Sequence, residues 1–179
     1  MKNIILIGFM GSGKTSVGIK LSYRLRHTLT DTDKKIERLY RMSISEIFER
    51  FGEEEFRNME TQCLEKLLGE PEGQIISVGG GLPMRSCNRE FLKRLGTVVY
   101  LRVKACTVCT RLAADTSRPL LQGEDREEKV QRLLEKRAPV YESVAEIIVD
   151  VDEKTLDEIA DEILGKAGIF FDGKGWVSG

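Results

Sequence analysis

The chain has 179 residues, of which 41% are hydrophobic and 32% are charged. This composition is typical of one globular domain that buries its own core, and it excludes disordered, collagen-like and membrane-spanning classes. The 28 Lys and Arg residues balance 29 Asp and Glu residues, which leaves a formal net charge of −1. Because there is no excess of positive charge, we expect no nucleic-acid partner and no membrane partner.

The first apolar run, interrupted at Asn3 and ended by Gly8, is too short for a signal peptide. We therefore expect a cytoplasmic chain whose four cysteines are reduced. Cys106 and Cys109 form a C-x-x-C pair, which fits either a redox or metal motif or two thiols on one helix. No second pair accompanies it, and His27 is the one histidine, so neither a zinc site nor a histidine-based triad is expected.

Apolar runs of strand length alternate with longer amphipathic segments along the chain. The runs predict strands over residues 3–7, 28–30, 74–78, 97–101 and 146–150, of which 28–30 is the weakest. The amphipathic segments predict helices over 14–26, 33–41, 44–51, 53–68, 88–95, 105–113, 125–137 and 155–165. This alternation predicts a three-layer α/β sandwich, with a five-stranded parallel sheet covered by helices on both faces.

Two segments fall outside this alternation. Residues 114–124 are polar, are interrupted by Pro119 and Gly123, and contain Arg118, which predicts a surface loop. The glycine-rich tail over 167–179 is expected to fray in part, unless Phe170, Phe171 and Trp176 dock against the domain. We therefore expect one domain over residues 1–166 followed by this tail.

The segment GFMGSGKT, residues 8–15, fits the pattern G-x-x-x-x-G-K-[ST] between a predicted strand and a predicted helix. Glycines let backbone N–H groups approach phosphate oxygens, and the helix N-terminus adds the positive end of its dipole. Lys14 supplies a cation for the outer phosphates, and the Thr15 hydroxyl can bind Mg²⁺. The motif predicts a nucleoside-triphosphate site, without deciding between phosphoryl transfer, hydrolysis and conformational switching.

Three further groups suggest an acceptor site. Asp31 and Asp33 follow the second strand, where they fit either metal and hydroxyl binding or the capping of the next helix. Gly79 to Gly81 follow the next strand and would allow close approach of a small ligand. Arg57 and Arg137 are suited to a carboxylate, although the ordinary interpretation of Arg57 is a solvated partner of nearby Glu residues.

From residue 3 to about residue 150, the chain resembles the shikimate kinases. The resemblance depends on motifs in a fixed order: GFMGSGKT, DTDKKIE, SISEIFERFGEEEFR, SVGGGLP, RPLL and RAPVY. It implies a small nucleoside-monophosphate-kinase-like fold with a lid over about 114–124 and a substrate-binding segment over about 32–69. Leu29 and Thr30 depart from the bulky apolar residues usual in that family, and the tail has no recognised counterpart.

The resemblance also implies roles for individual residues. The residues implied to hold ATP are Gly11, Ser12, Gly13, Lys14, Thr15, Ser16, Arg111 beside the adenine, and Arg118 on the lid. Mg²⁺ would be held by Thr15 and Asp31, and shikimate by Asp33, Arg57, Gly79, Gly80, Gly81 and Arg137. Lys14, Asp33 and Arg118 would be the catalytic residues.

The expected activity is therefore ATP-dependent phosphorylation of the shikimate 3-hydroxyl, by a monomer that needs Mg²⁺. Two alternatives stay open at this point. One is a related kinase of gluconate type, which shares the phosphate loop but does not need the DTD, FR and GGG motifs together. The other is a non-catalytic nucleotide switch, although the sequence contains no recognisable switch segment.

Overall fold

The computed structural model describes residues 1–112, 126–173 and 175–179. The predicted lid over about 114–124, with Arg118, lies outside the described residues. The main sheet consists of β1 (Asn3–Ile7), β2 (Leu29–Asp31), β3 (Ile75–Ser77), β4 (Gly96–Arg102) and β5 (Ile147–Asp150). The helices are α1 (Lys14–Leu25), α2 (Thr32–Tyr40), α3 (Ile44–Leu67), α4 (Ser86–Leu95), α5 (Ala105–Arg111), α6 (Arg126–Val144) and α7 (Leu156–Lys166), with a 3₁₀ turn η1 (Leu82–Met84).

The five strands pair in the order β2-β3-β1-β4-β5, and every pair is parallel. Ile5 in β1 aligns with Ile76 of β3 on one side and with Val98 of β4 on the other. All residues of β1 and β3 are buried, as continuous apolar strands require in a sheet that is covered on both faces. The predicted five-stranded parallel sheet is therefore confirmed.

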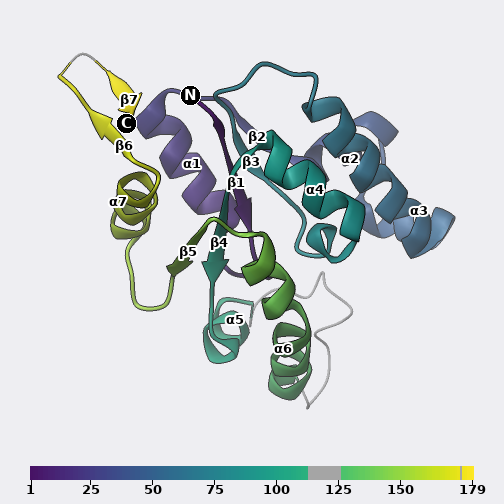
Figure 1. The fold of residues 1–179 in the computed structure, drawn as a ribbon. Helices are drawn as coiled ribbons and strands as arrows, with labels where there is room; N and C mark the ends of the chain where they lie inside the picture. Colours follow the sequence, from purple (N-terminus) through teal and green to yellow (C-terminus); the bar gives the residue numbers. More distant parts are fainter. Residues whose placement is uncertain (113–125, 174) are drawn as a thin grey trace.

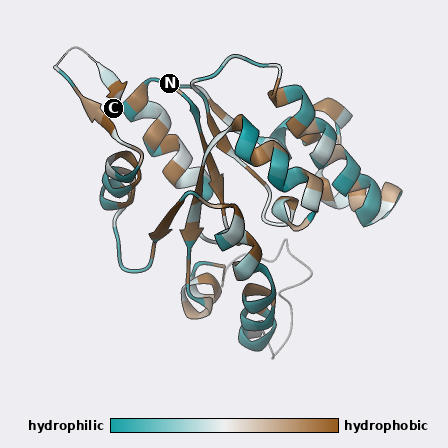
Figure 2. Ribbon diagram, viewed as in Figure 1, coloured by the Kyte–Doolittle hydropathy of each residue, from teal (hydrophilic) through white to brown (hydrophobic). Residues whose placement is uncertain are grey.

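Helices cover both faces of this sheet (Figure 1). On one face α1 packs against β1, β2 and β3 and against α7, while α4 and α6 contact β4 on the other face. Figure 2 shows the strands as the hydrophobic centre and places the hydrophilic residues on the outer sides of the helices. The carboxyl ends of the strands lie at the end of the sheet near α5 and α6, opposite the chain termini (Figure 1). Among the described residues, no helix has the length and apolar character needed to cross a bilayer.

A break at Gly52 divides α3 into two parts. Gly52 has φ 81 and ψ 170, a left-handed backbone that glycine adopts without a Cβ clash. The helices predicted over 44–51 and 53–68 are the two parts of α3 on either side of this residue. Phe48 and Phe56 pack across the break with their ring centroids 4.9 Å apart.

The helix predicted over 125–137 does not end before Pro139, and that prediction was wrong. The helix α6 continues through Pro139 to Val144. Proline removes one backbone hydrogen bond, but the following turn buries Tyr141 and Val144, which offsets this cost. As a result, Arg137 and Tyr141 stand four residues apart on one helix, a spacing that puts them on the same side.

The residues after α7 form an antiparallel hairpin of β6 (Ile169–Phe171) and β7 (Trp176–Ser178). Trp176 packs against the core and meets the ring of Phe171 edge-on at 5.7 Å. Phe170 and Phe171 remain exposed. Of the three aromatic residues that could have docked, Trp176 is the one that packs against the domain.

Candidate active site

The phosphate loop joins the buried strand β1 to α1 through glycines in unusual backbone conformations. Gly11 and Gly13 have φ values of 75 and 89, and Gly13 caps α1 without a side-chain hydrogen bond. The N–H groups of the first turn are therefore directed toward the space where a phosphate would sit. Ser12 is 1% exposed, and its Oγ has no hydrogen-bond partner among the described residues. Such a buried polar atom fits a loop that is completed by an anionic ligand.

Two cations lie on this loop. Lys14 Nζ donates to the carbonyl oxygens of Gly8 at 2.8 Å and of Phe9 at 3.0 Å. Arg111 Nη1 donates to the carbonyl oxygen of Gly11 at 3.0 Å and lies near Gly13. The structure therefore brings two of the three predicted nucleotide-binding cations to the phosphate loop, while the third, Arg118, lies outside the described residues. Thr15 and Ser16, which follow in the first turn of α1, are exposed to solvent.

The three glycines after β3 lie at the centre of the site, and each faces a different group. A Cβ on Gly79 would stand 2.7 Å from Asp33 Oδ1 and 2.8 Å from Glu60 Oε1. A Cβ on Gly80 would lie 3.2 Å from the Gly8 carbonyl oxygen in the phosphate loop. These close approaches explain why side chains are excluded here, and they place the carboxylates beside the loop that would hold the nucleotide.

Arg57 faces the third of these glycines. A Cβ on Gly81 would stand 2.5 Å from Arg57 Nη1 and 2.6 Å from Nη2. Arg57 donates to Glu60 Oε2 at 2.7 Å and to Glu53 at 3.0 Å, and its side chain is 18% exposed. Glu60 is fully buried, whereas Glu53 lies at the surface. The guanidinium is therefore held by a buried carboxylate at the edge of the glycine turn, where it can meet an acidic ligand.

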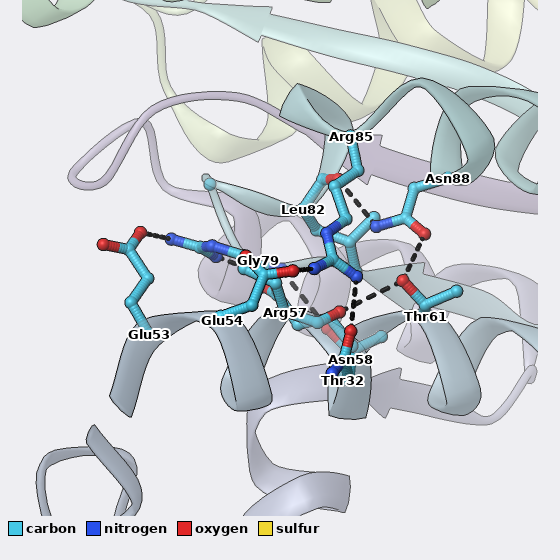
Figure 3. Close-up of polar contacts among 12 residues, drawn as sticks. Thr32, Glu53, Glu54, Arg57, Asn58, Thr61, Gly79, Leu82, Arg85 and Asn88 are labelled. Atoms are coloured by element: carbon cyan, nitrogen blue, oxygen red, sulfur yellow. Dashed lines mark hydrogen bonds and ion pairs between the residues drawn. The ribbon is translucent and has the colours of Figure 1, made fainter. Parts of the chain in front are cut away.

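A network of polar contacts fixes the glycine turn against α3 (Figure 3). Thr61 Oγ1 donates to Asn88 Oδ1 at 2.8 Å, and Asn88 Nδ2 donates to the Leu82 carbonyl oxygen at 2.9 Å. Asn88 is fully buried, so these bonds are not exchanged with water. Since Leu82 directly follows Gly81, the turn cannot easily move away from Arg57.

Arg137 reaches the site from α6. Its guanidinium carbon lies 5.6 Å from the ring centroid of Phe9, a buried residue of the phosphate loop. It stands one helical turn before Tyr141, and its positive charge lowers the pKa of the Tyr141 hydroxyl. Arg57 acts electrostatically on the same hydroxyl. The two arginines predicted to bind a carboxylate therefore converge from α3 and α6.

The geometry of the DTD segment shows the capping interpretation. Asp31 is the N-cap of α2, where Oδ1 accepts from the Lys34 N–H at 3.2 Å. Thr32 is buried and accepts from the Gly79 N–H at 3.2 Å, which ties this segment to the glycine turn. Asp33 lies in the first turn of α2 and faces Gly79. Capping by Asp31 leaves its other oxygen available for further contacts.

Sequence analysis missed Glu60 and Tyr141 as site residues. The three-residue spacing between Arg57 and Glu60 on a helix would have indicated an ion pair. Tyr141 belongs to the RAPVY motif, but the expected helix end at Pro139 obscured its position relative to Arg137. Cys106 and Cys109 both lie in α5, and no disulfide joins them. No cluster of metal-binding side chains occurs within residues 1–112, 126–173 and 175–179.

Glu60 is expected to make folding stability depend on pH in a distinct window. Burial raises its pKa from 4.5 to about 7, and Asp33 adds to the rise while Arg57 opposes it. A carboxyl that binds its proton more tightly in the folded chain stabilises the fold at low pH and loses this contribution as pH rises. The free energy of unfolding should therefore fall between about pH 4.5 and 7, by on the order of 3 kcal/mol.

Thermal or urea unfolding of the ligand-free protein between pH 5 and 8 measures this fall. Glu60→Gln should flatten it, because the amide does not titrate. Glu53→Gln, which alters the exposed partner of Arg57, should retain the wild-type slope. An identical slope in Glu60→Gln and the wild type would show that Glu60 does not titrate in this range.

A phosphate loop on a parallel sheet, with Arg57 at the neighbouring glycine turn and Arg137 over Phe9, is typical of a P-loop kinase that acts on a small molecule. A family model described as shikimate kinase matches residues 10–167. Among curated relatives, the shikimate kinase of Thermodesulfovibrio yellowstonii is 43% identical over 164 residues, which is 92% of this chain and 94% of the relative. The shikimate kinase of Sulfurihydrogenibium sp. is 43% identical over 166 residues, which is 93% of this chain and 98% of the relative.

Solved structures agree with this similarity. The shikimate kinase from Acinetobacter baumannii in complex with shikimate superimposes with a TM-score of 0.86 at 39% identity, covering 92% of this chain and 91% of that chain. The shikimate kinase from Aquifex aeolicus gives a TM-score of 0.79 at 35% identity, covering 92% and 95%. The chain belongs to the shikimate kinase family and is a phosphotransferase.

Proposed function

We propose that this protein transfers the γ-phosphoryl group of ATP to the 3-hydroxyl of shikimate, which yields 3-phosphoshikimate and ADP. The observation that carries the proposal is the glycine turn at 79–81, which is closely approached by Asp33, by Arg57 and by Gly8 of the phosphate loop. The similarity to a shikimate kinase in complex with shikimate supports the choice of acid.

Arg57 and Arg137 would bind the carboxylate of shikimate, while Asp33 would accept a hydrogen bond from the hydroxyl that attacks. Gly79, Gly80 and Gly81 would line the pocket and admit the ring close to the backbone. In a largely dissociative transfer, Asp33 mainly orients the hydroxyl and takes its proton late. Positioning by these groups would supply much of the acceleration.

On the nucleotide side, residues Gly11 to Ser16 would hold the phosphates and Arg111 would lie beside the adenine. Lys14 would stabilise charge on the transferred group, and we assign the same role to Arg118, which is outside the described residues. Thr15, whose hydroxyl is exposed at the start of α1, and Asp31 offer the hard oxygen atoms that suit Mg²⁺. When bound, Mg²⁺ neutralises charge on the phosphates.

We propose that residues 1–166 form the kinase and act as a monomer, with 167–179 as an appendage. Reduced thiols and the use of ATP favour a cytoplasmic enzyme. The reaction is tested by a coupled assay of ADP release with shikimate and gluconate side by side. Turnover with shikimate and little with gluconate is expected. Turnover with gluconate alone would establish the gluconate-type kinase, and nucleotide-dependent partner binding without turnover would establish the switch.

Replacing Arg137 by alanine is expected to raise the KM for shikimate about 10- to 100-fold, because a charged hydrogen bond contributes about 1.5–3 kcal/mol. The KM for ATP should change little, since Arg137 faces the acid side of the phosphate loop. Steady-state kinetics with each substrate varied in turn provide the measurement.

Arg132→Ala serves as the control, because Arg132 lies on the same helix and pairs with Glu128 at the surface. It should behave as the wild type. An unchanged KM for shikimate in Arg137→Ala would remove Arg137 from carboxylate binding.

A further inference from the structure

A tyrosine hydroxyl lies where the acid-binding arginines meet the glycine turn. Tyr141 is fully buried on α6, and its hydroxyl donates to the Gly80 carbonyl oxygen at 2.6 Å. A Cβ on Gly80 would lie 3.7 Å from this hydroxyl, which confirms how closely the two elements approach. The bond joins residues that are 61 positions apart in sequence, so it ties α6 directly to the turn after β3.

The hydroxyl has one proton and two lone pairs, and the structure accounts for how each is used. Burial raises the pKa of Tyr141, although Arg137 and Arg57 oppose this rise, so the phenol keeps its proton at neutral pH. The proton is committed to the Gly80 carbonyl oxygen, which leaves the lone pairs of the hydroxyl available to a second donor. The Arg137 guanidinium is suited to that role, because Arg137 stands one helical turn earlier on α6 and acts electrostatically on this hydroxyl.

The ring that carries this hydroxyl is itself held in place. Tyr141 packs against Tyr100, another buried tyrosine, with ring centroids 5.0 Å apart. The Arg137 guanidinium, in turn, lies over the ring of Phe9. Arg137 is thus fixed between an aromatic ring of the phosphate loop and a hydroxyl that is bonded to the glycine turn.

We propose that Tyr141 is a positioning residue for the acid substrate, which acts by joining the Gly80 peptide to Arg137 so that the guanidinium is oriented toward the substrate carboxylate. This proposal rests on the proposed function, since it assigns Tyr141 to the same acid site. It goes beyond that function because Tyr141 needs no contact with substrate to exert its effect. The expected consequence is a defect in binding of the acid, with the nucleotide site intact.

The test is Tyr141→Phe, which removes the hydroxyl and keeps the ring packed against Tyr100. The KM for shikimate should rise about tenfold, while kcat and the KM for ATP stay within about twofold, because one hydrogen bond to a charged group is lost on the acid side. Tyr100→Phe is the matched control. It also removes a buried hydroxyl, but one whose charged neighbours are Glu142, Arg102 and Asp150. It should leave all three constants unchanged.

An unchanged KM for shikimate in Tyr141→Phe would overturn the proposal, and so would an equal rise in the KM for ATP or the same defect in Tyr100→Phe. A double-mutant cycle with Arg137→Ala tests the route of the effect. If Tyr141 acts through Arg137, the tenfold effect should shrink to about twofold in the Arg137→Ala background. Full additivity would overturn the proposal.

A thermal-shift titration with shikimate gives the same comparison for a variant that is too unstable for steady-state kinetics. The concentration of shikimate that half-saturates the shift should rise about tenfold in Tyr141→Phe and stay unchanged in Tyr100→Phe. Failure of the wild type to release ADP with shikimate would overturn the proposed function. Wild-type turnover combined with a normal KM in Tyr141→Phe would overturn the role of Tyr141 alone.

Discussion

Replacement of Asp33 by asparagine is expected to lower kcat about 10²- to 10⁴-fold, the range typical of a group that handles a proton in the transition state. Asparagine has the same shape, so the close approach of this side chain to Gly79 is kept. It has no negative charge with which to attract and finally accept the proton of the attacking hydroxyl. Orientation of the acceptor and proton transfer are therefore lost together.

ATP binding should persist in Asp33→Asn, because Asp33 lies on the acid side of the glycine turn. Steady-state kcat and calorimetric titration of the nucleotide measure the two effects separately. Asp161→Asn, which changes an exposed aspartate of α7, is the matched control and should turn over normally. Near-normal turnover of Asp33→Asn would remove Asp33 from the mechanism, and loss of ATP affinity would indicate a structural role.

Gly81→Ala is expected to raise the KM for shikimate about 100-fold or more, because a displacement of about 1 Å at a binding group has effects of this size. Gly81 has φ −88, which any residue adopts, so the effect comes from contact alone. The new Cβ would stand 2.5 Å from Arg57 Nη1 and 2.7 Å from Cζ. Since Asn88 holds Leu82 in place, the guanidinium of Arg57 must shift, which disturbs its bond to Glu60.

Kinetics with each substrate varied in turn, together with the melting temperature, measure the consequences of Gly81→Ala. The KM for ATP should stay near the wild-type value. Gly165→Ala is the matched control, since a Cβ on that helical glycine meets nothing within 4 Å. It should retain full activity and gain about 1 kcal/mol of stability. A normal shikimate KM in Gly81→Ala would mean that Arg57 is not needed where the structure places it.

The sheet was predictable because its strands are continuous apolar runs, and each run carries its own signal. Residues 3–7 and 97–101 needed no information from elsewhere in the chain. Gly52 likewise marked the break in α3. The course of α6 through Pro139 was not predictable locally, because what sustains it is burial of Tyr141 against Tyr100, a residue 41 positions earlier in the sequence.

The residues of the candidate site likewise differ in whether a local sequence signal could predict them. The phosphate loop was recognisable because its residues are contiguous and follow a strand. Arg57 and Arg137 were picked out through resemblance alone, since on composition each looks like a surface cation. Glu60 and Tyr141 were missed because their roles arise from packing: a carboxylate acquires its raised pKa from burial, and a hydroxyl acquires its function from a carbonyl on another element.

The break at Gly52 has a mechanical consequence for this arrangement. Torsion about the backbone of that glycine turns the first part of α3, residues 44–51, as one piece. Arg57 and Glu60 both lie in the second part of α3, after Gly52. Their ion pair therefore does not depend on the direction of residues 44–51. Phe48 and Phe56 pack against each other across this break with their rings tilted by 43°. A change of torsion at Gly52 would therefore redirect residues 44–51 without altering the bond between Arg57 and Glu60.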